Sequence, residues 1–188
     1  YTLSLQDALP IYEWLRQRFR ILMGRRKIHY LLAQFDRMKR DAKELLTLVR
    51  ELRDEPEMLI DALLQQPGVG DYQNQLEIEA GIPLAQEALA LSREVGDRGR
   101  ELQSLISMVN QRLILSDPSW QPLAEEALEL ARESGEHYFE ARLLVGLGGI
   151  YAFGDQPERG MEYVEAAAAL AMSQGMEDRV VQMALLNL

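Results

Sequence analysis

Few side chains in this sequence could do chemistry, and they are scattered. The chain has no cysteine, so no thiolate can act as a nucleophile or a zinc ligand. The two histidines, His29 and His137, lie far apart and neither belongs to an HxxxH motif. We interpret both as structural or surface residues. The sequence therefore predicts no catalytic residue, no metal site and no enzyme activity.

A glycine cluster, GLGG at residues 146–149, is the closest approach to a phosphate-binding loop. It lies within a helical pattern rather than after a strand, and the sequence contains no GxxxxGK[ST] motif, so no cofactor is predicted. Each glycine in a helix costs about 0.5–1 kcal/mol relative to alanine. We expect Gly146 and Gly149 to allow close packing of another helix, and the alternative is the approach of a ligand backbone.

Charge is divided unevenly along the chain, whose net charge is -10. Residues 1–54 hold 12 Lys and Arg against 7 Asp and Glu, whereas residues 55–188 hold 8 against 23. The basic stretch RQRFRILMGRRK, residues 16–27, has the composition of a nucleic-acid or anionic-membrane patch. Because these residues point all around one helix and many carboxylates lie nearby, we predict a solvated or intramolecularly paired face, with no nucleic-acid or membrane partner.

No apolar run approaches the roughly 20 residues that span a bilayer, and the N-terminal residues do not form a signal peptide. We therefore expect a cytoplasmic protein. Residues 1–11, YTLSLQDALPI, resemble a translated sequencing adapter, and we expect a non-native or disordered arm there; a natural N-terminal arm is the alternative.

From Trp14 onward, apolar residues recur at helical spacing. Residues 13–33 and 37–53 are predicted to form an antiparallel hairpin, with Leu15, Phe19, Leu22, Met23 and Leu31 of the first helix available for burial and Asp36 capping the second. Trp14 and Trp120 are expected to be packing residues.

Later helices have their own start and stop signals. Asp54 and Asn74 are predicted N-caps, each followed three residues later by glutamate. Pro83 predicts an irregularity between residues 79 and 84, because proline cannot donate a hydrogen bond within the helix.

The segment EALELARESGE, residues 126–136, nearly repeats EALALSREVGD, which lies 39 residues earlier at residues 87–97. Gly96, Gly135 and Gly175 are predicted to end three equivalent helices in the left-handed conformation. Small residues align at Ala88, Ala127 and Ala167. Each repeat has an apolar face that only a neighbouring repeat can bury. The predicted array covers residues 12–188, with units at about 13–53, 54–96, 97–135, 136–175 and a truncated unit at 176–188.

The segment LLVGLGGIYAFGDQPERGMEYVEAAAALA, residues 143–171, is the best-formed unit. It resembles the tetratricopeptide repeat through Leu147, Gly148, Tyr151, Gly154, Asp155, Gly160, Tyr163 and Ala167. The resemblance implies an all-α fold, an α-solenoid of antiparallel helix pairs wound into a right-handed superhelix. Leu105 and Leu144 stand at the signature tryptophan position, and the period of 39 to 43 residues exceeds the typical length of about 34.

Repeats of this longer kind resemble arrays found behind nucleotide-binding modules in bacterial signalling ATPases, cyclases and transcription regulators. The resemblance implies a non-catalytic protein-interaction or regulatory scaffold, a segment of a larger chain. Its partner would be a protein or peptide, or another module of that chain. The alternative is a sensor that binds a small molecule or oligosaccharide and controls an attached ATPase or transcription-regulator module. Truncation is further suggested by five apolar residues left without a cap: Val180, Val181, Leu185, Leu186 and Leu188.

Partners of such arrays bind the concave groove lined by the first helix of each pair. Aligning two units places Gln103, Ile106 and Asn110 on this surface opposite Arg142, Val145 and Gly149. Only Asn110 and Arg142 resemble a basic-and-amide clamp for a peptide carboxylate. An ordinary solvated helix face is the alternative for each of these residues.

Overall fold

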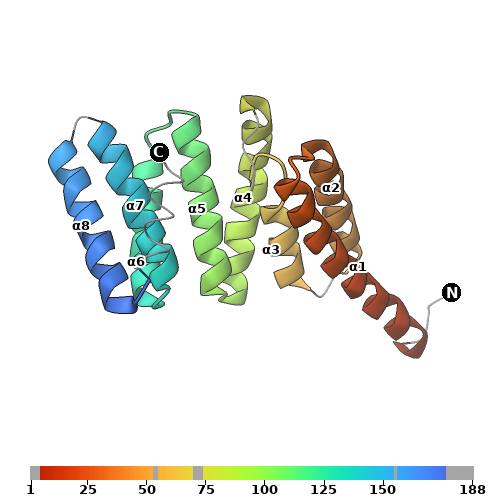
Figure 1. Cartoon of the computed structure of the whole chain (residues 1–188). Coiled ribbons are helices and arrows are strands. Elements are labelled where there is room, and N and C mark those ends of the chain that lie inside the picture. The colour runs from red at the N-terminus through yellow and green to blue at the C-terminus, as the bar shows by residue number, and fades with distance from the viewer. Residues whose placement is uncertain (1–4, 53–54, 70–73, 155, 177–188) are drawn as a thin grey trace. The chain divides into compact units, whose positions relative to one another are not determined.

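The computed structural model describes residues 5–52, 55–69, 74–154 and 156–176, with the backbone alone for residues 5–10. Eight α-helices account for most of these residues (Figure 1). The all-helical prediction is therefore confirmed for the described part of the chain. The helices are α1 (Leu5–Leu31), α2 (Phe35–Glu51), α3 (Pro56–Leu64), α4 (Gln75–Val95), α5 (Arg98–Ile114), α6 (Trp120–Glu133), α7 (His137–Phe153) and α8 (Pro157–Gln174).

The chain divides into two compact units, residues 1–118 and residues 119–188. In the first unit α1 packs against α2, α2 against α3, α3 against α4 and α4 against α5, and α3 also contacts α5. In the second unit α6 packs against α7, and α7 packs against α8. Packing of sequence neighbours is what a helical repeat requires. The predicted closing unit, with its five apolar residues, lies outside the described residues apart from Met176.

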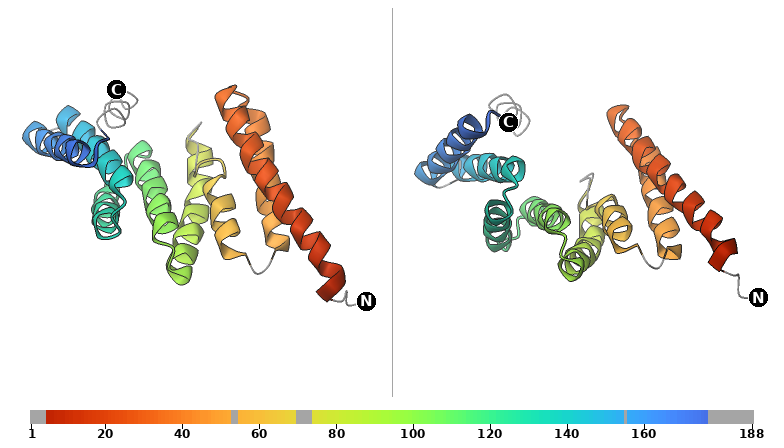
Figure 2. Two further views of the ribbon diagram at one scale, coloured as in Figure 1. Left: turned by 60° about the horizontal axis from the view of Figure 1, so that its bottom comes forward. Right: turned by 90° about the horizontal axis from the view of Figure 1, so that it is seen from below.

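Helix α1 is longer than the hairpin prediction requires. It has 27 residues, against 17 in α2, and it includes residues 5–11, which were expected to stand apart from the helices. Its N-terminal end projects beyond α2 in both views of Figure 2. A long, partly unsupported first helix is the result.

The core of the first hairpin joins α1, α2 and α3. Leu15, Phe19 and Leu22 of α1 are buried, as predicted, and pack against a cluster formed by Leu45, Leu48, Val49, Leu52 and Ala62. Leu31 was expected to be buried but is 74% exposed, because α1 ends there and the chain turns away at Ala33, whose φ is positive. The prediction for Leu31 was wrong.

Two predicted helix starts have different outcomes. Asn74 caps α4 as predicted, since its Oδ1 accepts a hydrogen bond from the Glu77 amide at 3.0 Å. Asp36 does not cap α2, because the helix already begins at Phe35 with Gln34 in the capping position. Asp36 lies instead in the first turn, where its negative charge interacts favourably with the helix dipole. The predicted cap Asp54 lies outside the described residues.

Pro83 neither ends α4 nor marks its start, since the helix runs unbroken from Gln75 to Val95. Packing on both sides of the proline offsets the lost hydrogen bond: Ile78, Gly81 and Ala85 are all buried. Gly81 approaches Gly68 so closely that a Cβ at Gly81 would lie 2.6 Å from the Gly68 carbonyl oxygen.

Three helices end in the same way, as the glycine spacing predicted. Gly96, Gly135 and Gly175 have φ values of 72°, 69° and 61°. The residue after each glycine donates its amide to the carbonyl five residues back: Asp97 to Ser92 at 3.0 Å, Glu136 to Ala131 at 2.9 Å, and Met176 to Ala171 at 3.0 Å. This is the Schellman motif, which closes the last turn of a helix with a left-handed residue.

Side-chain contacts repeat as well. Arg93 at the end of α4 bonds Glu101 of α5, with Nε 3.0 Å from Oε1. Arg132 at the end of α6 bonds Glu140 of α7 through the same atoms at the same distance, 3.0 Å. Both residues of the second pair lie 39 residues after their counterparts. Equivalent positions therefore make equivalent contacts.

Close approach of α7 and α8 depends on Gly148 and Gly160. A Cβ at Gly148 would lie 2.7 Å from Cγ2 of Val164, and a Cβ at Gly160 would lie 2.5 Å from the backbone nitrogen of Ala152. Gly146 and Gly149 differ, since a Cβ at either would meet no atom within 4 Å. The predicted close packing at Gly146 and Gly149 is therefore wrong. These two glycines lie on another side of α7.

Adjacent glycines in α7 provide a matched test of this packing. We expect Gly148→Ala to lower the free energy of unfolding by about 1–3 kcal/mol, because the new methyl group clashes with Val164. We expect Gly149→Ala to raise it by about 0.5–1 kcal/mol, because alanine is the better helix former and has room. Urea unfolding followed by circular dichroism measures both. Equal effects of the two substitutions would contradict the assigned helix contact.

A second test concerns Asp97, the N-cap of α5, whose Oδ1 accepts the Arg100 amide at 2.9 Å. This backbone hydrogen bond, together with the Arg100 side chain, lowers the pKa of Asp97 below its ordinary value of 3.8. A lowered pKa stabilises the fold above the pKa of the unfolded chain, and this stability is lost as the pH falls through the folded-state pKa. We expect Asp97→Ala to cost about 1 kcal/mol at pH 7. The difference from wild type should shrink below about pH 4 in parallel melting experiments; a constant difference down to pH 2 would argue against an ionised cap.

Candidate functional site

Both histidines have structural neighbours. His29 places Nδ1 3.0 Å from Oε1 of Gln34 and Nε2 3.5 Å from Oδ2 of Asp41. His137 and Glu140 form an HxxE pair, with Nδ1 3.7 Å from Oε2. A metal site needs more ligands than one such pair provides. Within the described ranges no group of three or more histidine, aspartate or glutamate side chains could hold a metal ion.

The basic stretch of α1 is largely paired within the chain. Arg16 bonds Glu55 and Arg18 bonds Glu44, while Arg25 makes two bonds to Asp41, at 2.8 Å and 2.6 Å. The hydrogen bond to the carboxylate of Asp41 raises the pKa of Arg25 further above its ordinary range. The prediction of intramolecular pairing is confirmed for these three arginines.

Several polar contacts of the first unit join residues about one repeat apart. Arg16 and Glu55 are 39 residues apart, and so are Arg100 and Asp61, whose two hydrogen bonds measure 2.8 Å and 2.9 Å. These hydrogen bonds to Asp61 raise the pKa of Arg100 above its ordinary range. Lys39 reaches Glu77, 38 residues on, at 2.6 Å. Such contacts tie a helix to its counterpart in the next pair.

The predicted groove residues of α5 do not share one environment. Gln103 is exposed and Asn110 is half-buried, but Ile106 is only 7% exposed. The same holds in α7 of the second unit, where Arg142 is exposed, Gly149 is half-buried and Val145 is 9% exposed. Ile106 and Val145 therefore contribute to the core rather than to an open surface.

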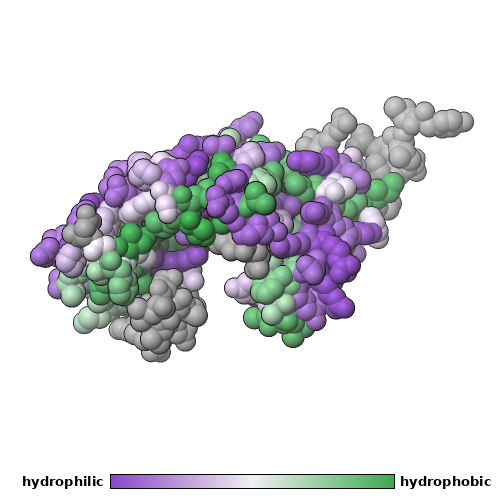
Figure 3. All heavy atoms as spheres, turned by 90° about the horizontal axis from the view of Figure 1, so that it is seen from above, coloured by the Kyte–Doolittle hydropathy of each residue, from purple (hydrophilic) through white to green (hydrophobic). Residues whose placement is uncertain are grey.

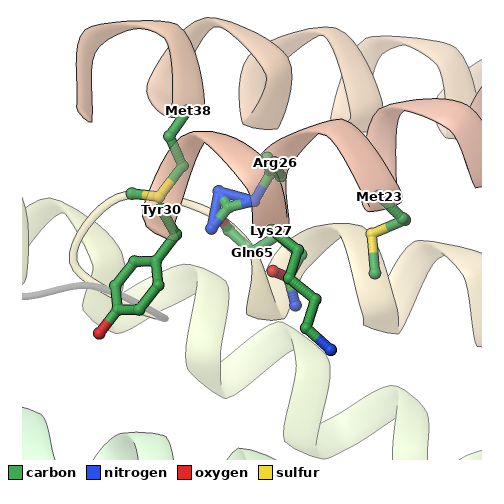
Figure 4. Close-up of a pocket in the computed structure, with 6 residues that line it drawn as sticks. All are labelled: Met23, Arg26, Lys27, Tyr30, Met38 and Gln65. Carbon is green, nitrogen blue, oxygen red and sulfur yellow. The ribbon is translucent and has the colours of Figure 1, made fainter. Parts of the chain in front are cut away.

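A cavity of about 390 Å³ in the first unit was not predicted (Figure 4). Four of its lining residues come from α1, one from α2 and one follows α3: Met23, Arg26, Lys27, Tyr30, Met38 and Gln65. Its size falls within the usual range of ligand sites. The sequence does contain a signal, because the four α1 residues have the spacing of one helix face.

The cavity is lined by two methionines and by polar side chains. Met38 is buried and Met23 is half-buried, and methionine adapts its shape to different apolar groups. Lys27 and Tyr30 are exposed and extend from the same side of α1 in Figure 4. Arg26 is buried and donates from Nη1 to the Gln65 carbonyl at 2.8 Å. We call this the methionine pocket. Its chemistry suits an apolar side chain next to a carboxylate.

Aromatic residues cluster in the second unit. The Tyr151 ring stacks on Tyr163 with centroids 5.6 Å apart and lies 5.9 Å from the Trp120 ring. The guanidinium carbon of Arg159 lies 4.3 Å from the centroid of the Tyr151 ring. The packing role predicted for Trp120 is confirmed. Trp14 is instead 52% exposed, so its predicted packing role was wrong.

No protein-family model matches this chain, and no curated protein matches it. Among the helices of the described residues, none is both long and apolar enough to cross a membrane.

Two arginines provide a test of which side chains lie on an open surface. We expect Arg142→Glu to change the free energy of unfolding by less than about 0.5 kcal/mol, because Arg142 is exposed. We expect Arg100→Glu to cost about 1–3 kcal/mol, because it removes two bonds to Asp61 and brings like charges together. Thermal unfolding compares the two variants. Substantial destabilisation by Arg142→Glu would place that side chain in the packed interior.

Proposed function

We propose that this chain is a non-catalytic protein-interaction module, an α-solenoid of tetratricopeptide-like helix pairs in a right-handed superhelix. One observation carries the proposal: the Schellman caps and the Arg–Glu pairs recur at the spacing of the sequence repeat. A chain that repeats both its stops and its contacts stacks one unit on the next. Such stacking creates extended surfaces made of many equivalent helices, and these surfaces suit peptides and partner helices.

The partner would bind along the first helices of the pairs. Gln103 and Asn110 of α5 and Arg142 of α7 support this proposal, because each leaves at least part of its side chain accessible. Gly149, seven residues after Arg142 in the same helix, adds open space, since a Cβ there would meet no atom within 4 Å. These positions present polar groups without ordering a catalytic centre.

The methionine pocket suggests what the partner carries at one position. An apolar side chain in the pocket would gain contact area with the flexible thioether of Met23 or Met38. An acidic group next to it would meet the ammonium of Lys27. We therefore propose a peptide partner that pairs a large apolar residue with an Asp, a Glu or a terminal carboxylate.

Resemblance to long-period arrays supports the wider role. The chain would act as a regulatory scaffold segment of a larger bacterial signalling protein in the cytoplasm. Its partner would then be a separate protein or the effector module of the same chain. A second candidate function is a sensor for a small molecule or oligosaccharide, and the open space at Gly146 and Gly149 favours it.

Selection from a displayed library of random peptides tests the proposal. We expect immobilised chain to enrich peptides that combine a large apolar residue with an acidic one. Lys27→Glu should lower the affinity for these peptides by about tenfold or more, since it reverses a charge that lines the pocket. Lys43→Glu is the control, because this exposed lysine of α2 does not line the pocket. Fluorescence anisotropy with the selected peptides measures each affinity.

Two results would count against the peptide-binding proposal. One is enrichment of peptides whose affinity neither Lys27→Glu nor Arg142→Glu changes. The other is failure to enrich any peptide, together with a melting-temperature shift by small sugars or nucleotides that Gly149→Leu abolishes. The second result would favour the sensor.

A further inference from the structure

Helix α1 carries an apolar stripe on its solvent side. Trp14, Ile21 and Ile28 are 52%, 66% and 55% exposed and follow one another at seven-residue intervals. We call these three residues the outer stripe. Their neighbours Leu15 and Leu22 are buried, so the stripe lies beside the core face of the helix and does not belong to it.

Exposed hydrophobic residues are common singly, but a row of them marks a contact surface. On the face drawn in Figure 3, hydrophobic residues lie between hydrophilic ones. The outer stripe differs from scattered exposure because its three residues lie about two helical turns apart along one side of α1. Tryptophan is enriched at protein–protein interfaces, and isoleucine is common where two helices pack.

A small cavity beside the stripe provides a socket for a partner side chain. It measures about 270 Å³, lies between α1 and α2, and has Trp14, Ile21 and Leu22 in its wall. Arg18, Arg25 and Glu44 complete much of its polar rim. One large apolar side chain from an approaching helix would fill this space, in the way a knob enters a hole.

Charge indicates the chemistry of the partner. Residues 11–52, which contain the outer stripe, hold 11 Lys and Arg against 5 Asp and Glu. Arg18 and Arg25 alternate with the stripe along α1, and their side chains remain 45% and 47% exposed despite their bonds to Glu44 and Asp41. Residues 11–52 thus carry a net charge of +6 (11 minus 5), which already counts the carboxylates paired with Arg18 and Arg25, and this excess attracts carboxylates on a partner helix.

We propose that the outer stripe of α1 docks an acidic amphipathic helix of a separate protein. The helix packs its apolar seam on Trp14, Ile21 and Ile28 and places glutamates or aspartates beside Arg18 and Arg25. A second copy of α1 fits less well, because pairing two stripes brings these arginines together. An anionic membrane also fits less well, because residues 55–118 of the same unit hold 11 Asp and Glu against 4 Lys and Arg. The surface is separate from the methionine pocket, which is lined by other α1 residues.

Tryptophan fluorescence reports directly on the stripe. In the full chain with Trp120→Phe, Trp14 is the remaining tryptophan. The probe is a synthetic helical peptide of about three heptads with leucine at the seam positions and glutamate on both flanks. We expect saturable binding with a blue shift of the Trp14 emission, and affinity that falls with added salt. The same peptide with lysine in place of glutamate should bind at least about tenfold more weakly.

Matched variants distinguish binding at the outer stripe from non-specific hydrophobic binding. Ile21→Asp should lower the affinity for the acidic peptide by about tenfold or more, because it places a charge in the outer stripe. Ile114→Asp is the control, since Ile114 is 52% exposed at the end of α5 in the same unit. Lys27→Glu tests independence from the methionine pocket and should leave the Trp14 blue shift in place.

Each alternative occupant predicts a different result. A blue shift with phosphatidylglycerol vesicles and none with the acidic peptide would overturn the proposal in favour of a membrane. Self-association in sedimentation velocity that Ile21→Asp abolishes would overturn it in favour of a second copy. Equal binding of the acidic and lysine peptides would remove the charge argument and overturn it as well. None of these results bears on peptide selection at the methionine pocket, so the two proposals fail separately.

Discussion

Each of the described helices has an apolar face that it cannot bury by itself, and the contact with its sequence neighbour is the interaction on which the rest depends. Buried alanines make that contact close: Ala88, Ala127 and Ala167 are at most 1% exposed and hold the same place in α4, α6 and α8. A left-handed glycine follows each of these helices, and after α4 and α6 the chain turns there into the helix that packs against them. Small residues and fixed stops together determine the geometry of the following pair.

Polar contacts add register to this apolar packing. A sliding helix could bury similar area in several positions, but hydrogen bonds between charged groups need defined atoms at defined distances. Arg100 meets Asp61 through two bonds, and Arg93 meets Glu101 as Arg132 meets Glu140. These partly exposed pairs contribute little stability each. Their value lies in opposing a shift of one helix along another, since a shift would separate charges at several places at once.

Local signals in the sequence predicted the helices and most of their ends, because a glycine stop or an Asn74 cap is decided by a few adjacent residues. Asp36 failed as a cap because Gln34 and Phe35 start the helix earlier. The errors at Gly149, Ile106 and Trp14 have another cause. Helical spacing shows which residues share one side of a helix. It does not show which side another helix will cover, so the sequence alone cannot separate a buried side from an exposed one. The methionine pocket escaped prediction for the same reason, since two of its residues lie outside α1.

Helix α1 shows how one element can serve several surfaces. Its core face, with Leu15, Phe19 and Leu22, is fully used by α2 and α3. One flank carries Lys27 and Tyr30, which line the methionine pocket. The other flank carries Trp14 and Ile21 beside arginines that are bonded to carboxylates of α2. Arginines fixed by Glu44 and Asp41 lose less side-chain freedom when a partner arrives than free ones would. The pairing that makes this basic helix look neutralised thus also prepares it to bind, because it holds the apolar stripe and its charged border in one arrangement.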